Sequence, residues 1–387
     1  MRRRKANTRA GIAATLAAAA ASVLLLPQLA PGQSDGGNRA LQAAVARLVR
    51  EAGIKSSGPG IAVLALKGSR VLVMEGYGLA NTESEEKITA CTRFDLASVS
   101  KSMTATAVLM LQERGLLSIG DDVRKYIPEL PNYPDGPLRI RDMLFHVSGL
   151  TDYLELDQPK RNRSYWINTD HLPNLSKAEL DFPIGEKYEY NNTNYMLAGL
   201  LVERVGKKPF GQFMRDEIFR PAGMTHTFVN SGPASVPADP ESPCNISVGY
   251  EKEGGEWVAS WGLPPDYRQP DHVEIGDGGV WSNLQDMAKW DAALRGNKLL
   301  KPATMKLALT GSKQNKGYGL GWQLCREDDG QLYGYGHNGY WSGFSTMYYN
   351  YLANDSTVVL LSNRGDAIDL DEIWDKLSGL IDTHARN

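Results

Sequence analysis

Hydrophobic residues recur along the chain with two different spacings, which together predict a mixed α+β protein. From Ala40 to Ala52 they recur at helical spacing and stop at Gly53, which predicts an amphipathic helix. The β-prone runs Ile61–Lys67 and Val71–Tyr77 flank the turn residues Gly68–Arg70. That arrangement predicts a β-hairpin near the beginning of the chain.

The middle of the chain favours helices. From Ser98 to Arg114 apolar residues fall on one side of a predicted helix, and Gly115 provides a C-terminal stop. Further helices are predicted over Tyr195–Val205 and Asn283–Leu294, with proline-rich stretches between them. We therefore expect a mainly helical lobe over about residues 96–310.

Strand-like runs return near the end of the chain. Leu320–Arg326, Phe344–Tyr351 and Thr357–Leu361 read as strands, and Asp369–His384 reads as a terminal helix. Strands at both ends predict one sheet assembled from both termini, with the helical lobe inserted between them. The sheet lobe would comprise about residues 39–95 and 311–387.

The first 32 residues have the layout of a secretory signal peptide. A basic head (Arg2 to Lys5, and Arg9) precedes an apolar, alanine-rich run from Gly11 to Leu26 and small residues at a plausible cleavage site. An uncleaved membrane anchor is the alternative, although the apolar run is short for a membrane span. Residues 33–38 then form a polar linker, and residues 39–387 the folded domain. We expect an exported protein, periplasmic or secreted, with no stable membrane span after processing.

Charge and composition narrow the possible partners. The chain has 42% hydrophobic and 22% charged residues, an ordinary globular composition. Removal of residues 1–32 takes away five positive charges and changes the formal net charge from −3 to −8. An acidic mature protein is a poor candidate for binding nucleic acid or anionic lipid.

The three cysteines are widely spaced and form no CxxC pair, so neither a metal nor a redox site is expected. In an oxidising compartment Cys244 and Cys325 could pair and leave Cys91 free. Alternatively, all three serve as small buried hydrophobic residues.

Ser98-Val99-Ser100-Lys101 is the strongest candidate for chemistry. Residues three apart share a face of a helix, so a neutral lysine at the fourth position can accept the serine proton. A serine in the first helical turn also has a free backbone N–H that can stabilise an oxyanion. About one SxxK is expected by chance in a chain of this length, and a second copy, Ser84 to Lys87, lies in an acidic loop without an apolar helix after it. Helix capping is the alternative role for Ser98.

The segment Phe94–Lys101 resembles the nucleophile segment of the serine β-lactamase and DD-peptidase superfamily. It is most similar to the branch of class C β-lactamases, DD-carboxypeptidases and esterases. Two further elements follow in the order of that branch: Tyr190-Asn191-Asn192 matches YxN, and His337-Asn338-Gly339 matches HxG. Supporting stretches are His146–Leu150, Pro221–Met224 and Gly276–Ser282, so that the resemblance covers about residues 55–363. It implies a β-lactamase/transpeptidase-like fold with an antiparallel sheet.

The resemblance also implies roles for individual residues. Ser98 would form the acyl-enzyme, with Lys101 and Tyr190 sharing the acid and base work. Asn192 would bind the amide side of the substrate, and His337 would assist proton transfer or face a substrate carboxylate. Structural roles are the alternatives: Tyr190 as a buried tyrosine, Asn192 as a turn former, and His337 as a structural histidine whose hydrogen bonds are all made within the protein.

The strand that carries the HxG element completes the implied site. Gly339 would lie against the substrate, and the backbone N–H groups of Ser98 and Tyr340 would form the oxyanion hole. The HNG sequence replaces the KTG of many relatives, and a histidine is largely neutral near pH 7 where a lysine offers a fixed cation. This weakens the case for an efficient β-lactamase.

We therefore expect a serine hydrolase without cofactor or metal, acting on a small-molecule or short-peptide substrate. A DD-carboxypeptidase-like enzyme or a D-amino-acid peptide or ester hydrolase fits best. The alternatives are a class C-like β-lactamase and a non-catalytic peptidoglycan or penicillin sensor, and the oligomeric state stays open. The HExxH motif of metallohydrolases and the GxSxG elbow of α/β-hydrolases are both absent.

Overall fold

The computed structural model describes residues 36–160, 165–232, 244–261, 273–365 and 367–385, so the predicted signal peptide lies outside the described residues. The helices are α1 (Gly36–Glu51), α2 (Ser100–Glu113), α3 (Ile140–Leu144), α4 (Asn168–Leu175), α5 (Asn192–Gly206), α6 (Phe210–Met214), α7 (Arg220–Ala222), α8 (Leu284–Arg295), α9 (Pro302–Ala308) and α10 (Leu370–Ala385). Short turns are the 3₁₀ helices η1 (Ala97–Val99) and η2 (Val123–Lys125) and the π-helical η3 (Arg215–Phe219). The strands are β1 (Ile61–Lys67), β2 (Arg70–Tyr77), β3 (Leu79–Asn81), β4 (Glu86–Lys87), β5 (Phe94–Asp95), β6 (Phe228–Val229), β7 (Gly249–Glu253), β8 (Glu256–Trp261), β9 (Val280–Ser282), β10 (Gln323–Arg326), β11 (Leu332–Trp341), β12 (Phe344–Tyr351) and β13 (Ser356–Ser362).

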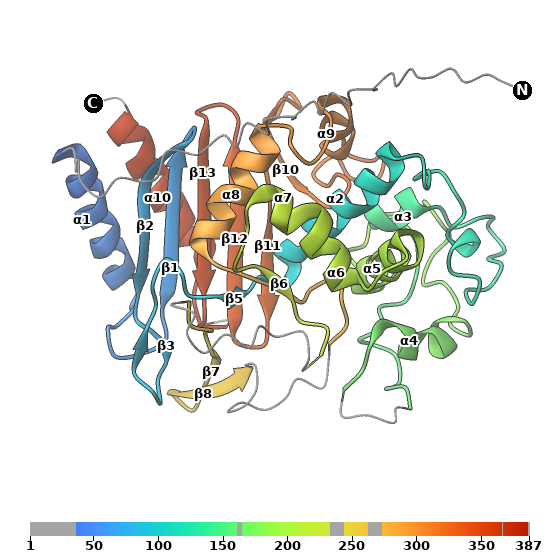
Figure 1. Ribbon diagram of the computed structural model, residues 1–387, viewed down its shortest axis with the longest axis horizontal. Helices are drawn as coiled ribbons and strands as arrows, with labels where there is room; N and C mark the ends of the chain where they lie inside the picture. The colour runs from blue at the N-terminus through green and yellow to red at the C-terminus, as the bar shows by residue number, and fades with distance from the viewer. Residues whose placement is uncertain (1–35, 161–164, 233–243, 262–272, 366, 386–387) are drawn as a thin grey trace, which may run out of the picture. The chain divides into compact units, whose positions relative to one another are not determined.

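A six-stranded antiparallel sheet in the order β10-β11-β12-β13-β1-β2 forms the centre of the fold (Figure 1). The predicted hairpin is β1 and β2, and β1 pairs with β13 from Ile61↔Ser362 to Lys67↔Ser356. The sheet is thus assembled from both ends of the chain. The predicted α+β, β-lactamase/transpeptidase-like fold is confirmed.

The sheet has an apolar core on each face. Alternate residues of β1 point to opposite faces; Ile61 and Val63 belong to the core beneath α1 and α10, whereas Ala62 and Leu64 belong to the core on the side of α8 and α2. Because both faces are covered, β1 is a nearly continuous apolar run. Helix α1 begins at Gly36 and so includes the last three residues of the predicted linker.

The segment between the two halves of the sheet contains the predicted helices and also strands that the pattern did not predict. A three-stranded sheet has the order β5-β9-β6, and β7 pairs with β8. Strands β5, β6 and β9, of two or three residues each, are too short to show a hydrophobic period. The hydrophobic pattern did not show strand β11 either, because Gly334, Gly336 and Gly339 interrupt it; only the family resemblance implied a strand at the HxG element.

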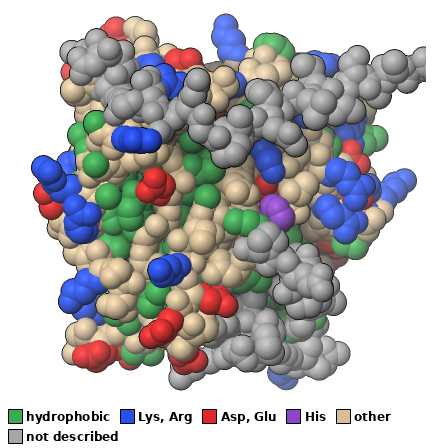
Figure 2. Space-filling view, turned by 60° about the vertical axis from the view of Figure 1, so that its left-hand side comes forward, with side chains coloured by type: hydrophobic (Ala, Val, Ile, Leu, Met, Phe, Trp, Pro, Cys, Tyr) green, Lys and Arg blue, Asp and Glu red, His purple; other side chains and the backbone are tan. Residues whose placement is uncertain are grey.

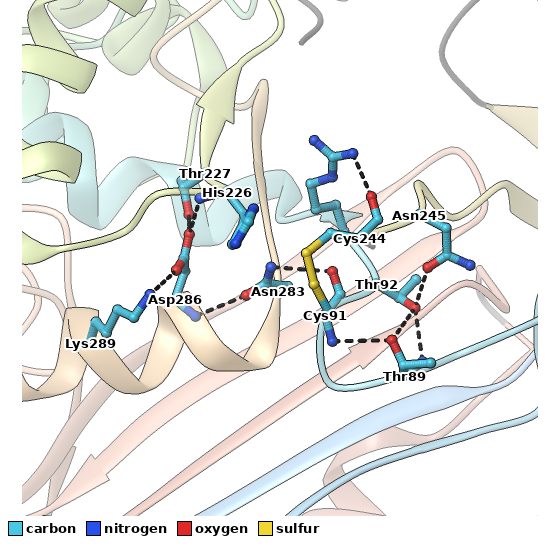
Figure 3. Close-up of a disulfide and its surroundings, with 11 residues drawn as sticks. Thr89, Cys91, Thr92, His226, Thr227, Cys244, Asn245, Asn283, Asp286 and Lys289 are labelled. Carbon is cyan, nitrogen blue, oxygen red and sulfur yellow. Dashed lines mark hydrogen bonds and ion pairs between the residues drawn. A yellow bond between two sulfur atoms is a disulfide. The ribbon is translucent and has the colours of Figure 1, made fainter. Parts of the chain in front are cut away.

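A disulfide joins Cys91 to Cys244 (Figure 3). Cys325 is the free cysteine. The predicted alternatives, a Cys244–Cys325 pair or three free cysteines, are therefore wrong. The pairing depends on a contact between segments that are distant in the sequence. The backbone N–H of Arg93 donates to the carbonyl of Asn245, and this bridge aligns the segments that carry Cys91 and Cys244. The disulfide thereby holds the chain three residues before β5, the strand that leads to Ser98.

Among the described residues, no helix is long and apolar enough to cross a membrane. Figure 2, turned toward the β2 side of the sheet, shows acidic and basic side chains mixed over the described part of this face.

Candidate active site

Ser98 lies in the 3₁₀ turn η1, directly between β5 and α2. Ala97 has a φ of 46°, a left-handed conformation that is rare for a residue with a side chain. The Asp95 carboxylate holds this turn by accepting the N–H of Ala97 at 2.8 Å. Strained backbone of this kind is common at functional sites, and here it presents a partly exposed hydroxyl at the opening of a helix.

Lys101, one turn along α2, is fully buried and points at Ser98. Its Nζ lies 2.9 Å from Ser98 Oγ, 2.9 Å from Asn192 Oδ1 and 2.8 Å from the carbonyl oxygen of Asp277. The two carbonyl oxygens can only accept hydrogen bonds, whereas the serine hydroxyl can also donate. The three acceptors match the three hydrogens of an ammonium group. A deprotonated amine in the same place keeps its bonds to the two carbonyl oxygens and can accept the proton of the Ser98 hydroxyl.

Asn192 is held in one orientation by Asp152. The Asp152 Oδ2 atom accepts both the backbone N–H of Asn192, at 2.7 Å, and its side-chain amide, at 3.0 Å. A carboxylate cannot donate at that position, so the amide oxygen of Asn192 must face Lys101. One hydrogen of the amide group is left over for a substrate in the cleft, which Asn192 lines.

Tyr190 also lines the cleft, and its side chain is 38% exposed. Lys101 Nζ lies 5.1 Å from the centroid of its ring, and the His146 ring packs on it at 4.4 Å. No described residue makes a hydrogen bond with the Tyr190 hydroxyl. The structure thus brings Tyr190 next to Lys101 through its ring, and a direct proton path between them needs a small rotation or a substrate.

Gly339 places β11 against the nucleophile. A Cβ atom at this position would lie 2.6 Å from the Leu96 carbonyl oxygen, 2.7 Å from Thr346 Oγ1 and 2.8 Å from Ser98 N. Only glycine permits that approach, which sets the backbone of Tyr340 beside Ser98. Tyr340 lines the cleft with a half-exposed side chain, an arrangement compatible with the expected oxyanion hole.

His337 lies beside this site and is 1% exposed. Its Nε2 lies 3.0 Å from Tyr318 Oη, and its Nδ1 lies 2.5 Å from the carbonyl oxygen of Asn338. Burial and the charge of Lys101 lower the pKa of His337 to about 3. Both nitrogens are occupied, so neither is available to a substrate carboxylate in this conformation.

Asp277 forms a buried acidic group behind Lys101. The Tyr153 hydroxyl donates to its Oδ2 at 3.0 Å. Burial is the main cause that raises the pKa of the Asp277 carboxyl to about 6, with Glu274 adding to the increase and Lys101 opposing it. Glu274 in turn contacts His171 Nε2 at 2.5 Å.

A cleft of about 1020 Å³ opens over Ser98. Its described lining combines aromatic side chains and amides with carboxylates, among them Asp277 and Glu274, and contains no lysine, arginine or histidine. A substrate that presents a carboxylate to the described wall would thus find no fixed cation there.

The remaining candidates have other roles. Ser84 is exposed in a turn, and Tyr348 of the second YxN match is buried in β12 with its hydroxyl bonded to Asp291. The one cluster of metal-ligand types among the described residues is Cys91, His226 and Cys244, in which both sulfur atoms form the disulfide.

Sequence analysis missed Asp152, His146, Tyr318 and the carbonyl of Asp277 as parts of the site. His146 and Asp277 lie in stretches already noted for their resemblance, which offered a signal. Tyr318 and Asp152 carried none, because their roles depend on contacts between distant segments.

The chain matches the family model named Beta-lactamase over residues 45–381. Penicillin-binding protein 4* of Bacillus subtilis (strain 168) is 30% identical over 319 residues, which is 78% of this chain and 67% of that relative.

Solved structures share the fold. A penicillin-binding protein from Bacillus halodurans superposes with a TM-score of 0.71 at 26% identity, over 88% of this chain and 98% of that one. The D-amino acid amidase of Ochrobactrum anthropi SV3, complexed with L-phenylalanine amide, gives a TM-score of 0.70 at 21% identity, over 91% and 100%. The chain therefore belongs to the Beta-lactamase family, within the superfamily of serine β-lactamases and transpeptidases.

Proposed function

We propose that the protein hydrolyses amide or ester bonds of small substrates through an acyl-enzyme on Ser98. The observation that carries this proposal is the position of Lys101, 2.9 Å from the Ser98 hydroxyl, with two carbonyl acceptors for its other hydrogens. This arrangement fits a neutral amine that takes the serine proton.

The reaction follows from these contacts. Ser98 Oγ gives its proton to Lys101 Nζ and bonds to the substrate carbonyl carbon, while the N–H groups of Ser98 and Tyr340 hold the oxyanion. The carbon–nitrogen or carbon–oxygen bond then breaks, and Lys101, with Tyr190 nearby, returns the proton to the leaving group. Water attacks the ester by the same path in reverse and releases the acid and the free serine.

Substrates without a carboxylate next to the scissile bond fit the cleft best, because its described lining offers no cation and His337 is buried. D-amino-acid amides and peptides and short esters are the first candidates. A family neighbour named as a D-amino acid amidase supports this choice.

A DD-carboxypeptidase or penicillin-binding activity is the second candidate, favoured by the name of the Bacillus subtilis relative, penicillin-binding protein 4*. Such an activity would require a cation from outside the described cleft wall. A non-catalytic penicillin sensor would be acylated without turnover.

Export is part of the proposal. The basic head and apolar run of residues 1–32 match the layout of a signal peptide, and the Cys91–Cys244 disulfide supports an oxidising compartment.

A substrate panel tests the proposal. The mature protein would be assayed with a D-amino-acid amide, a short p-nitrophenyl ester, a peptide ending in D-Ala-D-Ala and a chromogenic cephalosporin, next to Ser98→Ala. We expect turnover of the amide or ester that Ser98→Ala loses. Faster turnover of the D-Ala-D-Ala peptide or the cephalosporin would overturn the substrate choice, and no turnover of any substrate would overturn the hydrolase.

A further inference from the structure

A buried chain of hydrogen bonds links the two sides of the cleft beneath Tyr190. The hydroxyl of Tyr318 lies 3.2 Å from His146 Nε2 and 3.0 Å from His337 Nε2. All three side chains are at most 1% exposed. The chain thus connects the loop after α3 with strand β11.

The direction of the bonds in this chain can be deduced from the backbone groups at its two ends. The backbone N–H of Asn191 lies 3.1 Å from His146 Nδ1 and can only donate. A neutral His146 therefore carries its proton on Nε2 and donates it to Tyr318 Oη. At the other end the carbonyl of Asn338 can only accept, so a neutral His337 carries its proton on Nδ1, and its Nε2 accepts the Tyr318 proton.

Burial favours the neutral form of both histidines. Burial lowers the pKa of His146 well below its usual value, and the charge of Lys101 and the nearby His337 add to the effect. The titratable groups around the pair are Lys101 and the phenols of Tyr188, Tyr190, Tyr195 and Tyr318. In the described part of the chain no carboxylate contributes to either shift.

We propose that His146 and Tyr318 are positioning residues that fix His337 as its neutral Nδ1–H tautomer, and that His337 anchors the Asn338–Gly339 backbone beside Ser98 without transferring a proton in the reaction. The chain begins at Asn191, next to Tyr190, and ends at Asn338, next to Gly339. One set of bonds thus holds both the YxN segment and the HNG strand in register with the nucleophile. The inference rests on the proposed function for its kinetic consequence but not for its tautomers.

Nitrogen-15 NMR of the imidazole groups tests the tautomers directly, without any substrate. The protein has six histidines, and His146→Gln and His337→Gln assign the two signals. We expect both rings to stay neutral from pH 5.5 to 8, His146 as the Nε2–H form and His337 as the Nδ1–H form. Protonation of His337 in that range, or the opposite tautomer, overturns the proposal. If either variant fails to fold, the wild-type spectrum still decides whether one neutral histidine of each tautomer is present.

Kinetics test the consequence. Tyr318→Phe removes only the bridging hydroxyl, and we expect kcat to fall about tenfold with KM within about twofold, as for a lost buried hydrogen bond. The pH–rate profile should keep its shape in Tyr318→Phe and His337→Gln. Loss of one limb of the profile in His337→Gln would show that His337 transfers a proton in the reaction and would overturn the proposal.

Tyr126→Phe is the matched control, since its hydroxyl donates to Asp121 in another part of the fold. We expect it to leave kcat unchanged; if it lowers kcat as much as Tyr318→Phe does, the effect is merely structural and the positioning role is wrong. The two proposals fail separately. A protein without hydrolase activity can still show the expected tautomers, and an active enzyme with the wrong tautomers refutes this inference alone.

Discussion

Substitution of Gly339 by alanine should disable the enzyme while leaving it folded. The new Cβ would lie 2.6–2.8 Å from Leu96 O, Thr346 Oγ1 and Ser98 N, which is 0.6–0.8 Å closer than an ordinary contact of 3.4 Å. Two of these atoms belong to the backbone. The third cannot rotate away freely, because Thr346 Oγ1 donates to Leu96 O at 2.7 Å. Strand β11 and the nucleophile turn must therefore separate.

The magnitude follows from what that separation breaks. A shift of several tenths of an ångström moves the N–H groups of Ser98 and Tyr340 out of line with a developing oxyanion. Loss of one such donor costs about 10²–10³-fold in kcat. Overpacking of this kind destabilises a protein by about 1–3 kcal/mol.

The assay compares kcat, KM and thermal unfolding of Gly339→Ala with those of the wild type and of Gly379→Ala. Gly379 lies in α10 with nothing within 4 Å of an added Cβ. Alanine there should stabilise the helix by about 0.5–1 kcal/mol and leave kcat unchanged. A folded Gly339→Ala variant with kcat within about threefold of the wild type would refute the proposed role of this close approach.

Three further results are expected. Burial raises the pKa of the Asp277 carboxyl from 3.8 to about 6. The free energy of unfolding should therefore be highest below pH 4 and fall by about 3 kcal/mol as the pH rises through 6. Asp277→Asn should remove that fall from the pH dependence of urea unfolding, and an unchanged pH dependence in the variant would contradict the prediction. Reduction of the Cys91–Cys244 disulfide, which closes a loop across 153 residues, should lower the free energy of unfolding by about 2–5 kcal/mol; equal unfolding curves with and without reductant would argue against the bridge. Asp152→Ala frees the Asn192 amide to turn and should lower kcat about tenfold or more, whereas wild-type kinetics would show that Asn192 is oriented by other contacts.

Much of the fold could be predicted because its long elements carry clear periods. The hairpin Ile61–Tyr77 and the strand Phe344–Tyr351 are β-prone runs bounded by turn residues, and the structure has them within a residue of the predicted bounds. Strand β11 could not be found this way, since close packing against the nucleophile replaces its side chains with glycines. Strands β5, β6 and β9 are held by tertiary pairing alone.

The residues of the candidate site also differ in how far the sequence alone could predict their contacts. Ser98 and Lys101 are three residues apart, so helix geometry alone brings them together, as observed. Asn192 reaches Lys101 across 91 residues, and only the ordered motifs of a familiar family indicated that contact. The partners of His337 lie on segments that no local pattern connects. Its two expected roles assumed a free nitrogen, which burial beside Tyr318 removes.

Covalent labelling tests the central claim most directly. The purified protein would be treated with a fluorophosphonate probe, and the modified residue located by mass spectrometry of its peptides, with Ser98→Ala and Ser84→Ala treated alongside. Ser84 is the serine of the other SxxK sequence. We predict one adduct per chain, on residue 98, that is absent from Ser98→Ala and retained in Ser84→Ala. Equal labelling of Ser98→Ala and the wild type would contradict the assignment of the nucleophile.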